Sequence, residues 1–373
     1  MASARVGYGV NRAADVSFPL EERLFLEGNK ALAEAAIRAG CRFYAGYPIT
    51  PSTEVLEHMA KRLGEVGGVC MFPGTEIEAI TMAQGAAGAG ARAMTASSST
   101  AFSLMQETIA ECANGGWPIV IVNMARGSLQ GDYYQTVKGG GHGDYQLLVL
   151  APHTVQEMVD MTFEAFDLAQ KYHHPVVLFG DTVLAHTTET VVFRVPEFIE
   201  RPEYPWPTDG QKGRPRHALT YLGKSGLSTD IGASIAAGLE RFQRIAANET
   251  RFEQDFVDDA DVVVVAFGTA ARYAKYAISE LRAEGARIGY FRPITLNPFP
   301  TEAIANVAKG RRAVICFELN QGAMIHDVRS AVFGAAPVLE LKGVSERRTF
   351  GGIPSVAVLK QAFAQYLREE QLV

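Results

Sequence analysis

Strand-sized apolar runs alternate with stretches of helical periodicity along residues 22–186, and this alternation limits the fold more than any other feature of the chain. It is the pattern of βαβ units, which build a mostly parallel sheet with helices on both faces. The predicted strands cover residues 43–46, 69–72, 92–96, 118–123, 147–150 and 175–180. We therefore expect an α/β fold whose first domain is doubly wound.

One helix of this domain can be predicted together with its buried face. Phe102, Met105, Ile109 and Cys112 recur at helical spacing, so we expect them to line the core. Residues 97–100 (SSST) come just before them. Serine and threonine are favoured where helices begin, because their side chains bind free backbone N–H groups. The run therefore predicts a capped helix N-terminus.

The chain has 373 residues, which is long enough for two domains. After residue 186 the alternation stops, residues 201–217 are rich in proline, glycine and charge, and residues 228–253 have helical periodicity. Strands are predicted again at residues 262–267, 288–291, 313–318 and 338–341. We predict a first domain at 22–186, a connector at 187–255 and a second α/β domain at 256–373.

Charge and composition exclude several classes of function. The net charge is −6 and no cluster of lysine and arginine occurs, which argues against nucleic-acid and membrane-surface partners. Apolar runs such as Val262–Val265 are far too short to span a bilayer, and the N-terminal residues do not have the pattern of a secretory signal, so we expect a cytoplasmic protein. The four cysteines form no C-x-x-C pair, so we expect no iron–sulfur cluster and no metal site in this chain.

The segment YPITPST, at residues 47–53, follows the first predicted strand. Thr50 and Pro51 fit the N-cap and first positions of a helix, so a plain capped helix explains the pattern. The alternative is a ligand-binding loop, because open α/β sheets bind ligands at the carboxyl ends of their strands.

A second segment, residues 74–99, opens with two glutamates and continues with small residues that allow close helix packing. Glu76 lies at the start of the predicted helix, where the helix dipole favours a carboxylate, so it is either a structural charge or a functional group. Glu78 fits a solvated or packing role. The GAAGAG run at 85–90 lies inside the helix rather than at a strand-to-helix turn, which excludes a NAD site of the dinucleotide-binding type.

A long glycine-rich loop is predicted at residues 123–146, and loops of this length in compact domains are usually functional or disordered. Arg126 comes just after a strand and could bind a carboxylate through two hydrogen bonds, or form a surface ion pair. His142 lies between glycines and fits a turn better than a metal site. In the second domain, Gly268 precedes a helix that could receive an anion, although an ordinary turn explains it equally well.

Taken in order, these segments resemble the alpha subunit of the 2-oxoacid:ferredoxin oxidoreductase family, especially its branched-chain and 2-oxoglutarate types. The resemblance covers about residues 22–365. It depends on the stretches EGNKALAEAAIRAGCRFYAGYPITPSTE, E-I-x-A-I with GAAGAGARAMTASS, KGGGHGDYQLLVLAP, GRPR, FRPITLNPFP and FELNQGAM. YPITP and ARAMTASS are the distinctive parts.

The resemblance implies a thiamine-type pyrimidine-binding domain followed by a transketolase C-terminal-like domain. In the family, the glutamate that activates the pyrimidine ring lies nine residues before the first glycine of the GA..AG segment, and here this is Glu76 before Gly85. Its carboxylate would bind ring nitrogen N1′ of thiamine diphosphate. The resemblance also assigns Thr50 and Arg126 to the substrate, and the cofactor loop to Tyr47, Pro48 and Ile49.

The same resemblance implies several partners. A beta subunit would hold the diphosphate and its magnesium, and a gamma subunit and a ferredoxin-like iron–sulfur subunit would complete the enzyme, with a flavin or NAD subunit as a further candidate. The implied reaction is oxidative decarboxylation of a 2-oxoacid to its acyl-coenzyme A. All iron–sulfur clusters would lie on partner subunits.

One departure from the family concerns the substrate. Many relatives have a longer stretch after the arginine, whereas only residues 127–131 separate Arg126 from the following Asp-Tyr pair. We expect a remodelled pocket that accepts a branched or aromatic 2-oxoacid, with phenylglyoxylate as one example. Two alternatives stay open: a non-catalytic assembly subunit, and half of a transketolase-like or non-oxidative thiamine enzyme.

Overall fold

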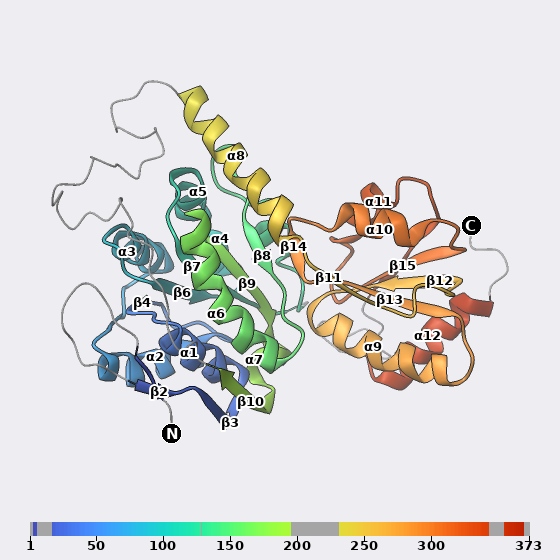
Figure 1. Ribbon diagram of the computed structural model, residues 1–373, viewed down its shortest axis with the longest axis horizontal. Helices are drawn as coiled ribbons and strands as arrows, with labels where there is room; N and C mark the ends of the chain where they lie inside the picture. The colour runs from blue at the N-terminus through green and yellow to red at the C-terminus, as the bar shows by residue number, and fades with distance from the viewer. Residues whose placement is uncertain (1–2, 6–16, 128, 195–230, 343–353, 369–373) are drawn as a thin grey trace.

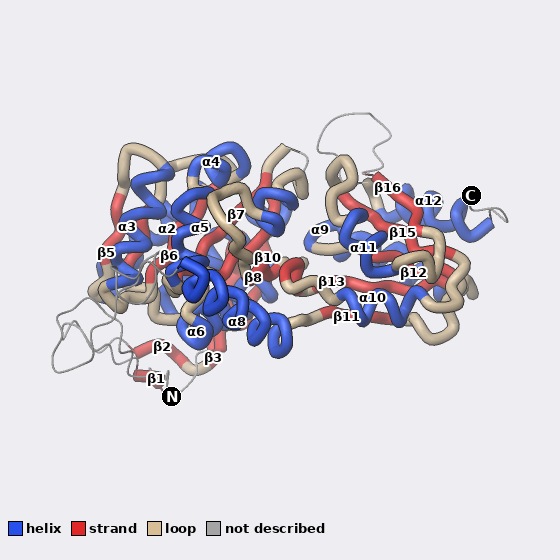
Figure 2. The backbone as a smooth tube through the Cα atoms, turned by 90° about the horizontal axis from the view of Figure 1, so that it is seen from above, coloured by secondary structure: helices blue, strands red, loops and turns tan. Residues whose placement is uncertain are grey.

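The computed structural model describes residues 3–5, 17–127, 129–194, 231–342 and 354–368. Two α/β units lie side by side, each with a sheet at its centre and helices against it (Figure 1). The view from above shows the same two units joined along one side (Figure 2). The predicted α/β fold is confirmed.

The first unit is built on a seven-stranded sheet with the order β14-β8-β9-β7-β6-β4-β5. Every neighbouring pair in it is parallel except β14 with β8. Its strands are β4 (Phe43–Ala45), β5 (Val69–Met71), β6 (Ala93–Ser97), β7 (Ile119–Ala125), β8 (Leu148–Leu150), β9 (Val176–Asp181) and β14 (Thr295–Asn297). The six strands predicted for this domain are all present.

Helices pack on both faces of this sheet, because its strands are apolar on both sides. One face is covered by α1 (Gly28–Arg38), α2 (Thr53–Arg62) and α6 (Val155–Tyr172). The other is covered by α3 (Glu76–Gly88), α4 (Ser99–Leu104) and α5 (Gln106–Gly115). The short α7 (Thr182–His186) follows β9. The predicted doubly wound arrangement is therefore correct.

The predicted buried stripe on the helix after residue 100 is confirmed. Phe102, Met105, Ile109 and Cys112 are fully buried. Only the continuity of the helix differs from the prediction, because the helix is interrupted at Met105, between α4 and α5.

An antiparallel pair of strands beside this unit was not predicted. β3 (Glu21–Glu27) pairs with β10 (Thr188–Arg194) along its whole length. Exposed positions alternate with half-buried or buried ones in much of both strands, and the exposed ones are polar except Phe25, so neither strand is a continuous apolar run. β10 lies in the range predicted as a connector. A smaller pair, β1 (Ser3–Arg5) and β2 (Ser17–Pro19), lies next to it along the chain.

The second unit has a five-stranded sheet with the order β11-β13-β12-β15-β16. Its strands are β11 (Phe252–Asp255), β12 (Val262–Val265), β13 (Ile288–Pro293), β15 (Ala313–Glu318) and β16 (Val338–Lys342). The four predicted strands are present, whereas the antiparallel edge strand β11 was missed. Helices α9 (Gly268–Ala283) and α12 (Val356–Arg368) cover one face, α10 (Thr301–Ala308) and α11 (Ile325–Val332) the other, and α8 (Ile231–Glu249) leads into the unit.

Strand β14 connects the two units. Its residues follow β13, where no strand was predicted, and Thr295 pairs with Leu150 of the first sheet. The strand has only three residues and an irregular register, so no apolar period marks it in the sequence. An apolar core also runs between the units, where Phe267 contacts the rings of Tyr133 and Phe179.

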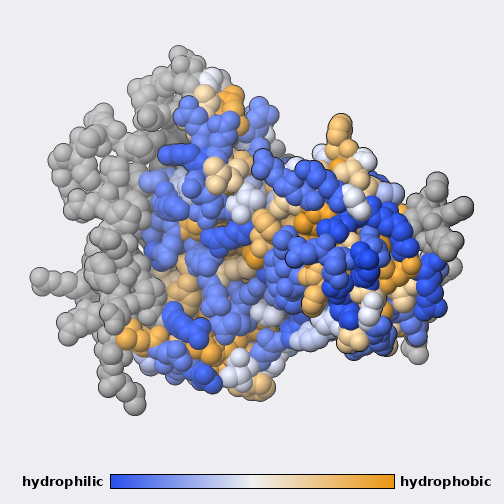
Figure 3. Space-filling model, turned by 45° about the vertical axis from the view of Figure 1, so that its right-hand side comes forward, coloured by the Kyte–Doolittle hydropathy of each residue, from blue (hydrophilic) through white to orange (hydrophobic). Residues whose placement is uncertain are grey.

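The outer surface agrees with the mixed composition of the chain. Figure 3 shows one face on which hydrophilic residues predominate and hydrophobic ones form small groups. None of the helices in the described ranges is both long and apolar enough to cross a bilayer.

Candidate active site

The loops that carry the predicted site residues follow four adjacent strands. β7, β6, β4 and β5 are neighbours in this order and run parallel, so their carboxyl ends meet at one edge of the sheet. Arg126 follows β7, residues 98–100 follow β6, residues 47–50 follow β4, and Glu76 follows β5. This edge is where open α/β sheets bind ligands.

Glu76 is the first residue of α3. Thr75 caps the helix, because its hydroxyl accepts a hydrogen bond from the Glu78 backbone N–H at 3.2 Å. The Glu78 carboxylate accepts from the Gly74 N–H at 2.7 Å and is exposed. This arrangement is a variant of the capping box, in which the N3 carboxylate accepts from the residue before the N-cap rather than from the N-cap itself. Of the solvated and packing roles that we expected for Glu78, the structure shows the solvated one, together with a contact that caps the helix.

The surroundings of Glu76 differ from those of Glu78. Glu76 is only 8% exposed, and within the described part of the chain its carboxylate makes no hydrogen bond and no ion pair. The carboxylate oxygens keep some access to solvent, and the helix N-terminus favours their charge. A nearly buried acceptor of this kind is suited to a ligand nitrogen.

Exposed apolar side chains surround the start of α3. We call this group the β5–α3 patch; its members, with their exposed fractions, are Val69 (50%), Met71 (40%), Phe72 (62%), Ile77 (50%) and Met82 (38%). β5 is the edge strand of the sheet. Exposed apolar groups on and beside an open strand edge are typical of surfaces that another chain covers.

The loop after β4 is accessible. Tyr47, Pro48 and Thr50 are exposed, and Ile49 is half-buried. The prediction that Thr50 is the N-cap and Pro51 the first helical residue is wrong.

A turn precedes the helix instead. The Ser52 N–H and hydroxyl both donate to the Ile49 carbonyl, at 2.9 and 3.0 Å, so that Ser52 is the N-cap and α2 begins at Thr53. The Thr50–Pro51 peptide is cis, and the buried Asn29 amide donates to the Pro51 carbonyl at 2.5 Å. Thr50 is thereby left on a loop rather than in a helix.

Arg126 contacts two of the neighbouring loops. Its Nη1 donates to the Thr50 carbonyl at 3.3 Å, and its Nη2 donates to the Thr100 hydroxyl at 3.1 Å. The side chain is exposed and, among the described residues, forms no ion pair. A guanidinium has five N–H donors, so three remain for a ligand. The structure thus brings the predicted Thr50 and Arg126 together.

Ser99 and Asp132 were not predicted as site residues. The Ser99 hydroxyl donates to the Asp132 carboxylate at 2.9 Å and accepts from the Arg126 backbone N–H at 3.0 Å. Burial raises the pKa of Asp132, although hydrogen bonds from Ser99 and Asn123 favour its charged form.

The serine run was interpreted as a helix cap, and that interpretation is wrong in its detail. Ser98 is the N-cap of α4 but makes no side-chain capping bond. Ser99 has a φ of 45°, in the left-handed region that favours glycine. Only its contacts with the distant loop could have revealed its role.

The glycine-rich loop docks on the second unit. The Gln130 side chain donates to the Phe267 carbonyl at 2.8 Å and accepts from the Leu319 N–H at 2.9 Å. The Tyr133 hydroxyl donates to Asp327 at 2.7 Å, and Lys138 pairs with the same carboxylate at 2.5 Å. A short π-helical turn, Tyr134–Lys138, lies in this stretch. The residues around Arg126 are therefore fixed by both units.

Gly268 was considered as the start of an anion site. The anion there is the protein's own Asp181, which is 3% exposed. Its carboxylate accepts from the Val183 and Leu184 N–H groups, at 3.0 and 3.1 Å, and also bonds the side chain and backbone of Thr269. Burial raises its pKa. An internal carboxylate thus satisfies the N-terminus of α9.

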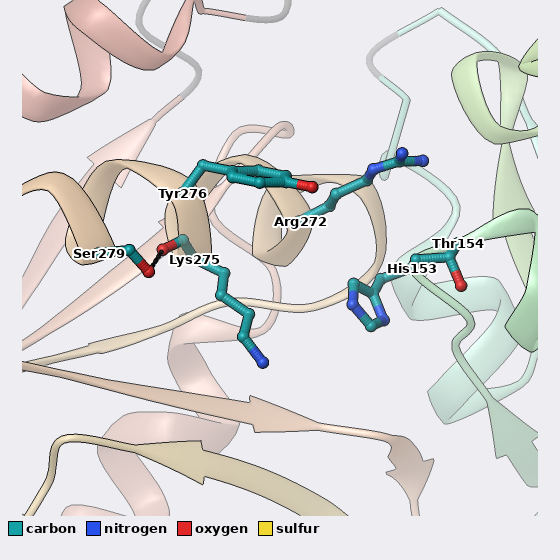
Figure 4. A pocket seen from close by; sticks show the side chains of 6 residues that line it. All are labelled: His153, Thr154, Arg272, Lys275, Tyr276 and Ser279. Carbon is teal, nitrogen blue, oxygen red and sulfur yellow. Dashed lines mark hydrogen bonds between the residues drawn. The ribbon is translucent and has the colours of Figure 1, made fainter.

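A cavity of about 290 Å³ lies between the two units, away from these loops. It is lined by His153, Thr154, Arg272, Lys275, Tyr276 and Ser279 (Figure 4). Its two cations already have carboxylate partners, since Arg272 pairs with Glu189 at 2.5 Å and Lys275 with Asp255 at 2.9 Å. The His153 ring is hydrogen-bonded to Glu157 at 2.7 Å. We assign the cavity no role in the chemistry.

Among the described residues, one group of side chains has metal-ligand character: Glu27, Glu54 and His186. Glu27 pairs with Lys30 at 2.9 Å and with His186 at 2.7 Å. Acidic groups with such partners are common without an ion, and the expectation that this chain holds no metal stays a prediction.

Comparisons with known proteins agree with this geometry. Residues 34–225 match the family described as "Pyruvate flavodoxin/ferredoxin oxidoreductase, thiamine diP-bdg", and residues 260–349 match "Pyruvate:ferredoxin oxidoreductase core domain II". The ketoisovalerate oxidoreductase subunit VorB of Methanothermobacter thermautotrophicus is 42% identical over 315 residues, covering 82% of this chain and 89% of the relative. The 2-oxoglutarate synthase subunit KorA of the same organism is 35% identical, covering 86% and 93%.

One solved structure is similar over most of the chain. It is the 2-oxoglutarate:ferredoxin oxidoreductase from Magnetococcus marinus, with 2-oxoglutarate, coenzyme A and succinyl-CoA bound. The TM-score is 0.81 and the identity 25%, over 93% of this chain. The chain spans 65% of the length of that protein's chain.

Proposed function

Because this chain belongs to the family of 2-oxoacid:ferredoxin oxidoreductase subunits, we propose that it supplies the pyrimidine-binding half of a thiamine diphosphate site, with Glu76 as the residue that activates the ring. The observation that carries the proposal is the Glu76 carboxylate, nearly buried at a helix N-terminus and without a partner among the described residues. Glu78 two residues later is exposed and used by the capping box.

When bound, thiamine diphosphate supplies the nucleophilic carbon and the electron sink for decarboxylation. The protein has to hold the ring and control a proton on it. The Glu76 carboxylate hydrogen-bonds N1′ of the pyrimidine and shifts the proton balance of the ring, and its low exposure strengthens that bond. Tyr47, Pro48 and Ile49 form the accessible loop beside it that receives the ring.

Arg126 and Thr50 bind the substrate. Two of the five guanidinium donors hold the arginine against Thr50 and Thr100, so its plane is fixed before the substrate arrives. The remaining donors face no acceptor of the described chain and suit the carboxylate of a 2-oxoacid. Because Arg126 and Thr50 are held in place before the substrate binds, less entropy is lost when the substrate reaches the reactive geometry.

The substrate is a monocarboxylate with a branched or aromatic side chain. Residues 46–52, 72–75, 98–100 and 126–133 form the four loops, and Arg126 is the one lysine or arginine in them. A second carboxylate, as in 2-oxoglutarate, would have no cation from these loops. The higher identity to a ketoisovalerate oxidoreductase subunit than to a 2-oxoglutarate synthase subunit favours the same choice.

The rest of the enzyme lies on other chains. The β5–α3 patch next to Glu76 is the surface for a beta subunit that holds the diphosphate and magnesium. The scattered cysteines leave the iron–sulfur clusters to a ferredoxin-like subunit, with a gamma subunit completing the transfer to coenzyme A. Electrons then leave to ferredoxin, or to NAD through a flavin subunit.

The test is activity of the native complex with a panel of 2-oxoacids, coenzyme A and a viologen dye. Glu76→Gln should lower turnover by about 100-fold or more, because it removes an acid–base group, whereas Glu78→Gln is the matched control and should retain most activity. Full activity of Glu76→Gln would refute the assignment. Iron–sulfur absorbance in the complex distinguishes an oxidoreductase from a transketolase-like enzyme, and an unchanged rate without this subunit would make it an assembly subunit.

A further inference from the structure

Ser99 has a backbone conformation that serine rarely adopts. Its φ is 45°, and it lies where β6 turns into α4. Glycine would take this conformation without strain, so a serine here is explained best by a use for its side chain.

Every polar group of Ser99 binds β7 or the loop that follows it. Its hydroxyl donates to Asp132 at 2.9 Å and accepts from the Arg126 N–H at 3.0 Å. Its N–H donates to the Asn123 side chain at 3.4 Å, and its carbonyl accepts from the Gln135 amide at 3.1 Å. One residue thus connects positions from residue 123 to residue 135.

These contacts are shielded from water. Ser99 is 9% exposed, Asp132 8%, and Asn123 is fully buried. Asn123 also donates to the buried Thr136 hydroxyl at 2.9 Å. Hydrogen bonds in such surroundings are stronger and hold their geometry better than exposed ones.

The connection has a direct consequence for Arg126. Its backbone N–H is held by the Ser99 hydroxyl, while its guanidinium is held by Thr100, the next residue of the same turn, and by the Thr50 carbonyl. The turn after β6 therefore fixes the arginine at both its backbone and its side-chain end.

We infer that Ser99, anchored by Asp132, is a positioning residue that sets Arg126 for the carboxylate of the substrate. The inference rests on the proposed function, since it takes Arg126 as the substrate-binding cation. Ser99 touches neither cofactor nor substrate in this role and acts through the arginine. In this backbone conformation the hydroxyl lies between Arg126 and Asp132.

The test compares Ser99→Gly and Ser99→Ala in the native complex. Glycine tolerates the positive φ, so Ser99→Gly should fold with an unchanged or higher melting temperature, whereas Ser99→Ala keeps the strain and loses the hydroxyl. Both should raise KM for the 2-oxoacid by roughly tenfold, because a displaced arginine binds the carboxylate less well, and leave KM for coenzyme A unchanged. Ser279→Ala is the control, because Ser279 is exposed on α9 of the second unit and its hydroxyl bonds the Lys275 carbonyl of its own helix; it should change neither KM.

Arg126→Lys separates this inference from the proposed function. If it raises the KM for the 2-oxoacid while Ser99→Gly leaves that KM at the wild-type value, Ser99 does not position the arginine and the proposed function stands. If Arg126→Lys and Glu76→Gln both leave activity intact, the proposed function itself fails. An equal rise in both KM values for Ser99→Gly would indicate general damage and also overturn the inference.

Discussion

Glu76 and Arg126 follow parallel strands of one sheet, yet their surroundings differ. Arg126 is held by hydrogen bonds to two loops, and its own loop is docked on the second unit through Gln130 and Tyr133. Glu76 has no polar partner in the described chain, and exposed apolar side chains of the β5–α3 patch surround it. This chain therefore fixes one side of the site by itself and leaves the other side to a partner.

The difference has a physical reason. An arginine that must meet a small, mobile substrate benefits from being fixed in advance, because the ordering cost is then met during folding. A carboxylate that must meet a cofactor held by another chain needs a desolvated position and an open approach. Each kind of surrounding suits the ligand that we propose for it.

The largest expected effect comes from disturbing the open side. Phe72→Asp places a charge in the middle of the β5–α3 patch, where desolvation in an interface would be costly, so binding to the partner subunit should weaken by about 100-fold. The isolated subunit should keep its melting temperature, since Phe72 is 62% exposed. Co-purification and titration with the partner measure the loss.

Phe25→Asp is the control for that experiment. Phe25 is 72% exposed on β3, outside the patch, so its replacement should leave assembly unchanged. If Phe72→Asp bound the partner with wild-type affinity, the β5–α3 patch would not be the interface. The contrast between a fixed Arg126 and a Glu76 that depends on a partner would then be wrong.

The fixed side should respond in substrate affinity and not in assembly. Arg126→Ala removes the charged donors and should raise KM for the 2-oxoacid by about 100-fold, in line with about 1.5–3 kcal/mol for a hydrogen bond to a charged group. Arg126 is exposed, so the melting temperature should stay the same. Steady-state kinetics at saturating coenzyme A check this, and a loss in kcat alone would argue for a role other than carboxylate binding.

The contacts between the glycine-rich loop and the second unit should contribute to the stability of the isolated subunit. Asp327→Ala leaves the fully buried Tyr133 hydroxyl without its acceptor and should lower the free energy of unfolding by about 1–3 kcal/mol. The double variant with Tyr133→Phe removes both partners and should recover part of the loss. Chemical denaturation of the isolated subunit measures both, and additive losses would mean that the pair is not coupled.

The sequence alone was sufficient to predict the strands that carry the site. Apolar runs mark β4 and β6 to β9 because parallel strands inside a sheet are buried on both faces, and β5 is apolar although it is the partly exposed edge strand. The strands β3, β10, β11 and β14 escaped prediction because they are short, polar or half-exposed, and their partners lie far away in the chain.

The site could be predicted only in part for a related reason. Glu76 and Thr50 follow strands directly, so their neighbourhood follows from the topology. Ser99 and Asp132 are 33 positions apart, and no local pattern shows that the hydroxyl of one meets the carboxylate of the other. The wrong helix start at Thr50 has the same origin, because the turn made by Ser52 cannot be read from capping preferences.

The smallest expected effect concerns how Glu76 is held. Thr75→Val keeps the size of the side chain and removes the capping oxygen, so the isolated subunit should lose about 1 kcal/mol of stability. Decarboxylation by the assembled complex should fall far less than in Glu76→Gln, because the partner subunit that we propose would cover the start of α3 and hold it in place. A loss of activity as large as that of Glu76→Gln would mean that this chain, rather than its partner, fixes the carboxylate, and the two sides of the site would then be alike.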